Sequence, residues 1–426
     1  MINLFSKSDV KRTDNYQLPT VNLFKLAWRN LWRNKRRTLI TAASVFFAVF
    51  LAILMRGFKH GQWVYLIDSV LHSYTGYVQI HEKDYWDNKT FDYSMAINDT
   101  ALTKVRQLKQ VKGLIPRLES FSLASSGEKT KGVLTLGIDP SLENEFTQLD
   151  KKIVSGRFIN LNDNGVVLSE RLSKYLSLKV NDSIVLLSQG YQGIAANGIY
   201  KIIGIVKLPS PEFDNQLVYM PLPLAQEYYS AQGRITSLVV DLNNPQDMDY
   251  TVKKIKIIIP TDKFEVMSWE DMLIELYQQY ISNEGASMIM ISLLYLIVGF
   301  GVFGTVLMMI AERRHEFAIM ITLGMQRRRL MTLVGTELLL ICIMGLVFGF
   351  LGSVPIVGYF HFNPIHFTGN MAKAFASFGM EPIIPTAWQL EYMLQQVYIV
   401  SFIVLAVLIY PLYTVYKLDL TKAMRR

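Results

Sequence analysis

The sequence predicts an α-helical membrane protein with four transmembrane helices and a large α+β extracytoplasmic domain between the first and second of them. Of its 426 residues, 18% are charged and 51% are hydrophobic, whereas soluble domains are about a quarter charged. The apolar residues gather in four runs that lack charged side chains, and a helix needs about 20 such residues to cross a bilayer. These runs are 38–55, 286–311, 338–360 and 392–416. The long segment between the first two runs has the composition of a globular domain.

The positive charge lies beside the apolar runs and predicts their orientation. The net charge is +8, and basic residues concentrate in 1–37, 312–329 and 417–426, whereas 57–285 has more acidic than basic residues. By the positive-inside rule, the basic segments are expected in the cytoplasm. We therefore expect a multi-pass membrane protein with both termini cytoplasmic and 57–285 on the other side of the membrane. This distribution argues against nucleic acid as a partner.

The chain is expected to begin with a cytoplasmic N-terminus, 1–37, that contains an amphipathic interfacial helix in contact with membrane lipid. The first apolar run is too long for the core of a cleaved signal peptide and follows a long basic lead, which favours an uncleaved anchor. The remaining predicted segments are the first transmembrane helix 38–56, the periplasmic domain with its stalk 57–285, the second transmembrane helix 286–311, a cytoplasmic coupling helix 312–329, the third transmembrane helix 330–353, a short periplasmic loop 354–391, the fourth transmembrane helix 392–416 and a cytoplasmic tail 417–426.

The periplasmic segment mixes strand and helix patterns, which predicts an α+β domain. Stretches rich in Val, Ile and Tyr are typical of strands, namely 77–81, 132–138, 183–187, 200–206, 216–220 and 237–242. Helical spacing occurs in 101–111, 170–177, 223–230 and 250–258. Ser268 followed by Glu270 and Asp271 predicts the start of a further helix that continues into the second transmembrane helix as a stalk.

No catalytic chemistry can be assembled from the residue spacing. The sequence has no Gly-x-x-x-x-Gly-Lys-Ser/Thr phosphate loop, no His-Glu-x-x-His and no Cys-x-x-Cys. Its single cysteine, Cys342, lies in the third apolar run, so the periplasmic domain has no disulfide. We therefore expect no enzymatic activity, no metal and no cofactor bound by this chain.

The segment 312–329 carries the most informative pattern. It predicts a helix that begins with Glu312, Arg313 and Glu316 and is stopped by Gly324, a residue suited to a left-handed cap. Apolar residues of this helix can share one side, namely Phe317, Met320, Ile321 and Gly324. Two interpretations remain open: the apolar side lies on the membrane surface, or it docks a cytoplasmic partner.

This segment resembles the FtsX/MacB-type ABC transporter permeases, which include the LolC/LolE-type lipoprotein-releasing permeases. The family's loop pattern is matched by Glu312, Arg313, Glu316, Phe317, Ala318, Ile319, Met320, Leu323 and Gly324. The family's Glu-then-Gly-x-x-x-Gly arrangement is matched by Glu337, Gly345 and Gly349, and its pre-span helix by 26–31. The closing segment 410–425 is also similar, although Leu420 stands where proline is common.

The resemblance implies a transporter subunit of a bacterial inner membrane that does not pass substrate through its own membrane helices. In such systems two permeases pair, as identical copies or as paralogues, and each docks a cytoplasmic ABC ATPase through a helix that corresponds to 312–324. ATP and Mg²⁺ would be bound by that ATPase, a separate polypeptide because this chain has no phosphate loop. ATP hydrolysis would then drive periplasmic movements, with lipoprotein release toward the outer membrane as the favoured outcome.

Other residues extend the expected site. Glu337 lies within an apolar stretch, which indicates either a paired ionisable group or a position near the hydrated interface. Gly345 and Gly349, or alternatively Gly299, Gly301 and Gly304, would permit close helix packing and are candidates for a dimer face. The resemblance also implies a hairpin that engages a periplasmic lipoprotein carrier; Tyr191 and Ile194 are the candidates in 188–198, and a flexible hairpin tip is the alternative.

Three rival functions stay open. A MacB-like complex would export an antimicrobial compound or peptide, although such chains usually carry their ATPase on the same polypeptide. An FtsX-like signalling scaffold would activate a cell-wall hydrolase, but the periplasmic domain is larger than that of FtsX. A membrane-anchored enzyme would need a catalytic cluster that the sequence does not contain.

Overall fold

The computed structural model describes residues 20–33, 35–97, 99–377 and 382–419. It divides into a helical unit and an α+β unit. The helical unit comprises Met1–Lys59, Ala286–Asn363 and Thr386–Arg426, and the α+β unit comprises His60–Gly285 and Pro364–Pro385.

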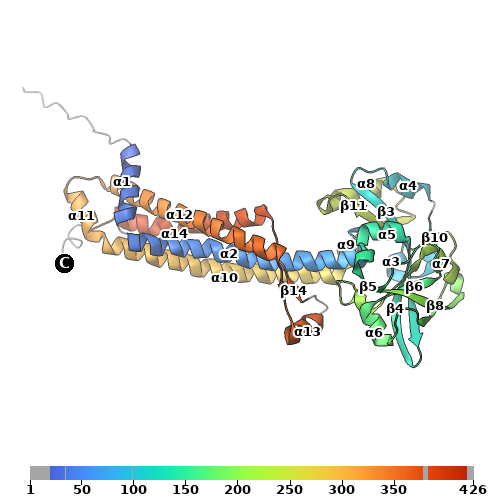
Figure 1. Cartoon of the computed structure of the whole chain (residues 1–426). Coiled ribbons are helices and arrows are strands. Elements are labelled where there is room, and N and C mark those ends of the chain that lie inside the picture. The colour runs from blue at the N-terminus through green and yellow to red at the C-terminus, as the bar shows by residue number, and fades with distance from the viewer. Residues whose placement is uncertain (1–19, 34, 98, 378–381, 420–426) are drawn as a thin grey trace, which may run out of the picture. The chain divides into compact units, whose positions relative to one another are not determined.

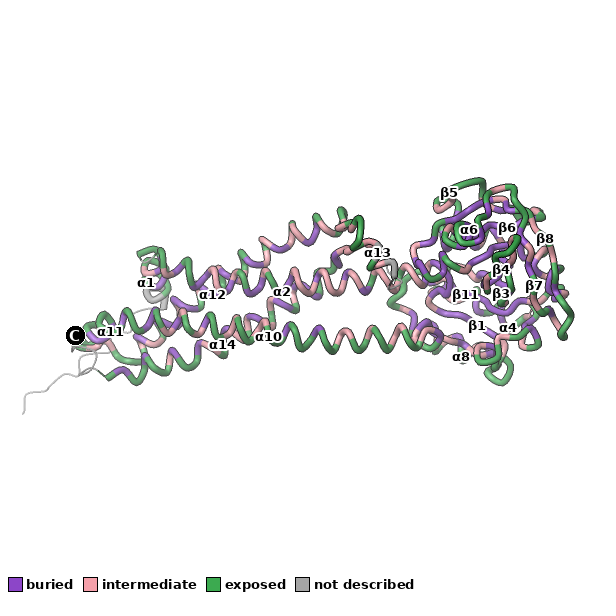
Figure 2. Tube along the Cα trace, turned by 90° about the horizontal axis from the view of Figure 1, so that it is seen from below, coloured by how far each residue is buried: buried purple, intermediate pink, exposed green. Residues whose placement is uncertain are grey.

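Within the described residues, four helices are long and apolar enough to cross a bilayer. They are α2 (Lys35–Val70), α10 (Ile274–Glu312), α12 (Arg327–Phe362) and α14 (Leu390–Tyr416), and the short helices α1 (Thr20–Arg33) and α11 (Arg314–Thr322) accompany them (Figure 1). Exposed residues recur along α10, α12 and α14 in Figure 2, and many are large and apolar, as lipid contact requires. The predicted four-helix membrane architecture is therefore confirmed.

Two predicted boundaries differ from the structure. The loop expected from residue 354 begins later, because α12 continues through Pro355 to Phe362; proline is tolerated in membrane helices where neighbouring groups satisfy the freed backbone. The loop itself contains β13 (Ile365–His366), α13 (Gly369–Ser377) and β14 (Ile383–Ile384), and β13 pairs with β14. The first span is part of a helix that extends beyond 56 to Val70.

The stalk helix starts where the sequence predicts, but it has a break. Ser268 and Asp271 form a reciprocal capping box, in which each side chain accepts a hydrogen bond from the other residue's backbone N–H. The short helix α9 (Trp269–Met272) ends at Leu273, whose φ of −114° and ψ of 53° are not helical, and α10 begins at Ile274. The predicted continuous helix is thus two helices.

The α+β unit is built on a ten-stranded mixed sheet with the order β12-β1-β11-β3-β4-β9-β6-β8-β5, and β7 pairs with β3 and β8. Its strands are β1 (Val78–Glu82), β3 (Val111–Ser126), β4 (Lys129–Ile138), β5 (Ile153–Gly156), β6 (Gly165–Ser169), β7 (Ser183–Gln189), β8 (Ala195–Val206), β9 (Leu217–Pro221), β11 (Ser237–Leu242) and β12 (Phe264–Ser268), with β2 (Met95–Ala96) and β10 (Arg234–Ile235) forming a separate pair. Its helices include α3 (Tyr85–Asn88), α4 (Thr100–Val105), α5 (Pro140–Thr147), α6 (Glu170–Leu176), α7 (Leu222–Tyr228) and α8 (Met248–Ile258).

Hydrophobic residues alternate between the two faces of this sheet, as the two-residue period of a strand requires. In β6, Val166 and Leu168 belong to one buried cluster and Val167 to another. In β9, Val218 and Met220 face the first cluster, and Leu217 and Tyr219 the second. The sheet therefore separates two cores.

All six predicted strands are present, as β1, β4, β7, β8, β9 and β11. The helix predicted for 101–111 is wrong beyond Val105, because Val111 already begins β3. Strand β3 pairs with β4, β7 and β11, and these non-local hydrogen bonds override the local helical pattern.

Lys89 gives the α+β unit an expected pH dependence. It follows α3, its ammonium group lies over the Trp86 ring, and burial lowers its pKa to about 8. Between this value and the ordinary lysine pKa, the unfolded chain holds more protons, so stability should rise as the pH increases from about 8 to about 10.5. A Lys89→Met variant should lose this rise and be about 1–3 kcal/mol more stable at pH 7. Denaturant unfolding of the full chain in detergent at pH 7.5 and pH 10 measures both effects; Lys109→Met, at an exposed lysine, is the control, and an unchanged slope in Lys89→Met would contradict the expectation.

Candidate coupling sites and packing contacts

Helix α11 is separated from α10 by one residue and ends at a glycine. Arg313 has φ −96° and ψ 7°, which breaks the helix, and its carbonyl accepts from Phe317 N at 3.0 Å. At the other end, Gly324 N donates to Ile321 O and Met325 N to Met320 O, both at 3.0 Å. This pair of bonds is a Schellman motif, and the φ of Gly324 is +97°. The predicted glycine stop is therefore confirmed.

The break at Arg313 directs its guanidinium into the helical unit. Arg313 Nη1 donates to both carboxylate oxygens of Glu337 in α12 at 2.7 Å, and both side chains are buried. Arg313 Nε also lies 3.2 Å from Glu316 Oε2. Of the two interpretations of Glu337, the paired one is thus what the structure shows. A buried charge needs such a partner, because removal from water costs several kcal/mol per ion, in order of magnitude.

The apolar side of α11 is turned toward the helical unit itself. Phe317 and Ala318 are buried in its core, and Met320 and Ile321 are partly buried against the same cluster. Phe317 is only 1% exposed. The expectation that Phe317, Met320 and Ile321 form a free docking or membrane-facing side is therefore corrected. The exposed residues of 314–324 are Arg314, His315, Glu316, Ile319, Thr322, Leu323 and Gly324.

The glycines of α12 lie in a contact within the chain. A Cβ atom on Gly345 would come within 2.6 Å of Val45 Cβ and 2.8 Å of Ala42 O, both in α2. A Cβ atom on Gly349 would come within 2.8 Å of Phe46 O, also in α2. This pair is therefore occupied by close packing of α2 on α12 and is corrected as a dimer-face candidate. Gly301 and Gly304 in α10 have no neighbour within 4 Å of such a Cβ atom.

Substitution by alanine should change the stability of the protein differently at these two sets of glycines. Gly349→Ala should destabilise the protein by about 1–3 kcal/mol, because the methyl group overlaps backbone that cannot rotate away. Gly301→Ala should leave the stability unchanged or raise it by up to about 1 kcal/mol, because alanine is the better helix former. Denaturant unfolding of the two purified variants in the same detergent measures the difference. Equal stability would show that α2 and α12 are not in close contact.

A buried polar network joins the end of the first long helix to the sheet. Helix α2 continues into the π-helical turn η1 (Leu71–Thr75), where Tyr74 Oη donates to Glu119 Oε2 at 2.7 Å. Arg117 Nη1 donates to Tyr74 O, and its Nε and Nη2 donate to Glu143 at 2.9 and 2.7 Å. Arg117 and Glu143 are almost completely buried. These residues were not predicted from the sequence, in which the charged Arg117 and Glu119 on either side of Leu118 were the available signal.

Comparison with known protein families finds a match for most of the chain. Residues 38–258 match the family model of the MacB-like periplasmic core domain, and residues 288–420 match that of the FtsX-like permease C-terminal region. The chain belongs to the FtsX/MacB-like family of ABC transporter permeases. The resemblance seen in the sequence is therefore confirmed.

The relatives of this permease carry several names. It is 20% identical to the lipoprotein-releasing system transmembrane protein LolC of Neisseria meningitidis, over 64% of each chain. It is 22% identical to the LolE protein of Haemophilus influenzae, over 52% of this chain and 54% of that protein. It is 26% identical to the uncharacterized ABC transporter permease YclI of Bacillus subtilis, over 49% of this chain and 46% of that protein. The matches thus span less than two thirds of each relative.

The hairpin candidate of the permease is held by its own domain. The backbone N–H of Tyr191 donates to Tyr229 O at 2.8 Å, and the Arg234 guanidinium lies 4.7 Å from the centre of the Tyr191 ring. Ile194 is exposed. The structure therefore brings Tyr191 into the domain surface and leaves Ile194 as the outward residue of this pair.

An apolar sheet face was not identified from the sequence. Phe121 and Leu123 in β3, Leu187 in β7 and Ile199 in β8 are all exposed. The register places Leu123 opposite Leu187, and Val185 opposite Ile199. Exposed apolar patches commonly mark contact sites. The alternation of Phe121, Leu123 and polar neighbours was the available signal, but the sequence could not show which strand faces were covered.

No metal-binding cluster was predicted, and within the described ranges no group of three His, Cys, Asp or Glu side chains is positioned to hold a metal ion.

Proposed function

We propose that this protein is the membrane subunit of an ABC transporter that couples ATP hydrolysis on a separate ATPase to movements of its α+β unit. Helix α11 and both termini would lie in the cytoplasm, and the α+β unit would lie in the periplasm, as the positive-inside rule favours. The permease would act with a second copy or a paralogue. It would contribute no catalytic residue and bind no cofactor.

The observation that carries the proposal is the geometry of α11. Its inner side is fixed to the helical unit by Phe317 and by the Arg313–Glu337 pair. Its outer side presents two exposed apolar residues, Ile319 and Leu323, and Leu323 is 83% exposed. An apolar side chain that is so exposed on a helix held in place is suited to insert into a pocket of a partner. A displacement of α11 would be transmitted to α12 through the ion pair of Arg313 with Glu337.

A second observation supports transmission toward the α+β unit. Helices α2 and α10 are each longer than a bilayer span and contribute residues to both units. At the end of α2, Tyr74 is hydrogen-bonded to both Glu119 and Arg117 of β3. Displacement of this helix end would therefore be passed to the central strands of the sheet.

For the cargo, we propose lipoproteins or related lipidated molecules, released toward the outer membrane. The similarity to proteins named LolC and LolE supports this choice over an antimicrobial compound or a signalling role. A periplasmic carrier would contact the exposed residues Phe121, Leu123 and Ile194.

Purification of the tagged permease from native membranes, followed by mass spectrometry of the bound proteins, tests the proposal. We expect an ABC ATPase to be retained, and an Ile319→Gln/Leu323→Gln variant to retain it roughly tenfold less, as for interface hot spots. Ile257→Gln is the matched control, because Ile257 on α8 is also 83% exposed. Co-purified lipoproteins would support the cargo.

Two results would contradict it. Equal recovery of the ATPase with the parent and the double variant would exclude α11 as the docking helix. If no ATPase is recovered with the parent under conditions that keep a permease pair together, the transporter proposal itself fails, and an FtsX-like scaffold becomes the better explanation.

A further inference from the structure

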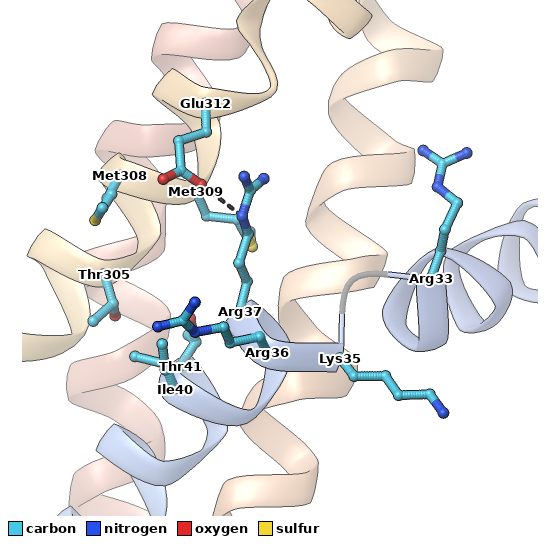
Figure 3. Close-up of a pocket in the computed structure, with 10 residues that line it drawn as sticks. All are labelled: Arg33, Lys35, Arg36, Arg37, Ile40, Thr41, Thr305, Met308, Met309 and Glu312. Carbon is cyan, nitrogen blue, oxygen red and sulfur yellow. Dashed lines mark ion pairs between the residues drawn. The ribbon is translucent and has the colours of Figure 1, made fainter.

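A basic pocket lies in the helical unit where the beginning of α2 meets the end of α10. Its volume is about 640 Å³. It is lined by Arg33, Lys35, Arg36, Arg37, Ile40, Thr41, Thr305, Met308, Met309 and Glu312 (Figure 3). The lining thus combines four cations with a single carboxylate and an apolar wall.

The cations divide into two pairs. In Figure 3, Arg36 and Arg37 extend from α2 toward α10, whereas Arg33 and Lys35 extend away from α10. Arg37 Nε lies 2.6 Å from Glu312 Oε2, and Arg33 lies 3.5 Å from Glu316. Within the part of the chain that the structure describes, no carboxylate pairs with Lys35 or Arg36. Two positive charges of the pocket therefore have no carboxylate partner among the described residues.

The apolar wall continues from the pocket onto the lipid-facing side of the helices. Ile40 and Met308 are both exposed, and Phe47 is exposed further along α2. On α10, Gly304 has no side chain, and a Cβ atom added to it would have no neighbour within 4 Å. The surface beside Met308 is therefore recessed. The site therefore passes from cationic to apolar within a few residues along each helix.

We infer that this pocket binds the phosphate of an anionic phospholipid, with its acyl chains on Ile40 and Met308. The phosphodiester would be held by Arg36 and Arg37, and Lys35 and Arg33 would add long-range attraction. Basic pockets between membrane helices are suited to anionic headgroups, and arginine holds phosphate through paired N–H groups. A free phosphate would use the same cations but would leave the apolar wall unused. The inference does not depend on the ATPase, on the cargo or on the orientation of the chain.

Native mass spectrometry of the full-length protein, released from vesicles that contain phosphatidylglycerol and phosphatidylcholine in equal amounts, tests this inference. We expect retained phosphatidylglycerol to exceed phosphatidylcholine about fivefold or more, because each cation contributes about fivefold to anionic-lipid binding. A Lys35→Gln/Arg36→Gln variant should lose phosphatidylglycerol about tenfold or more by the same measure. It keeps the Arg37–Glu312 ion pair.

The matched control is Arg314→Gln/Arg328→Gln, which makes the same charge change at two exposed arginines outside the pocket. It should retain phosphatidylglycerol as the parent does, and Arg36→Lys should retain most of it. Equal retention of the two lipids, or an equal loss in the control, would overturn the inference. Displacement of the lipid by millimolar inorganic phosphate would also overturn it, since the pocket would then be a site for a free anion. Gel filtration of each variant excludes misfolding as the cause of a loss.

Discussion

Replacement of Arg313 by methionine is expected to lower the free energy of unfolding by about 3–5 kcal/mol, because it leaves the Glu337 carboxylate buried without a partner. Arg313 Nη1 donates to both oxygens of that carboxylate at 2.7 Å, and Glu337 is 3% exposed. Denaturant titration of the full-length protein in detergent measures the effect. Arg313→Lys should be milder, because it keeps the charge but loses the guanidinium geometry.

The double variant Arg313→Met/Glu337→Met provides the decisive control. Replacement of a whole buried ion pair by apolar residues of similar size is often neutral or stabilising. The double variant should therefore recover most of the stability that Arg313→Met loses. If it is as unstable as the single variant, the loss comes from the packing of Arg313 and not from the uncompensated charge. If the single variant loses less than about 1 kcal/mol, the pair behaves as a surface ion pair does, and its burial is wrong.

Replacement of Arg117 by methionine is expected to have a similar effect on the α+β unit, about 3–5 kcal/mol. It leaves the buried Glu143 without its two hydrogen bonds and removes a donor from the backbone carbonyl of Tyr74. In addition, the end of the first long helix should keep only one of its two hydrogen-bonded attachments to β3, the one from Tyr74 to Glu119. Hydrogen exchange of 71–75 measures that attachment, and protection should fall in the variant.

The control for this prediction is Arg157→Gln. Arg157 forms a bidentate pair with Asp163, at 2.6 and 2.8 Å, but its side chain is exposed. Solvent screens such a pair, so the loss should be below about 1 kcal/mol. Exchange of 71–75 should be unchanged. Equal losses in the two variants would show that the burial of Arg117 does not determine its contribution.

The sequence predicted the membrane architecture well because long apolar runs have few alternatives in a bilayer. It also predicted the stop at Gly324 and the start at Ser268, because both depend on residues a few positions apart. The break at Leu273 and the continuation of α12 through Pro355 were not predictable in this way. Both depend on backbone conformation that neighbouring elements fix, and a single segment does not encode those neighbours.

The sequence predicted where the candidate site lies in the chain, but not which side of α11 is exposed. The sequence grouped Phe317, Met320 and Ile321 on one side, and the structure does place them against one cluster, but that cluster is the protein's own core and neither the membrane surface nor a partner. The reason is the break at Arg313, which turns the helix so that Phe317 enters the core beside the ion pair with Glu337. The partner of Arg313 lies 24 residues away in sequence. Helical periodicity groups the residues of one side, but it cannot show what covers that side when a distant contact sets the rotation of the helix.

The close contact of α2 with α12 at Gly345 and Gly349 has a mechanical consequence. The side chains of Val45 and Val49 in α2 lie directly against Gly345 and Gly349 of α12. Because this contact is close-packed, the two helices cannot slide along each other without first moving apart. Within the helical unit, α2 and α12 should therefore move together as one rigid body. The open glycines Gly301 and Gly304 place no such restriction on α10. Motion of α10 against this pair of helices would instead have to break the ion pairs at its end, Arg37–Glu312 and Arg313–Glu337.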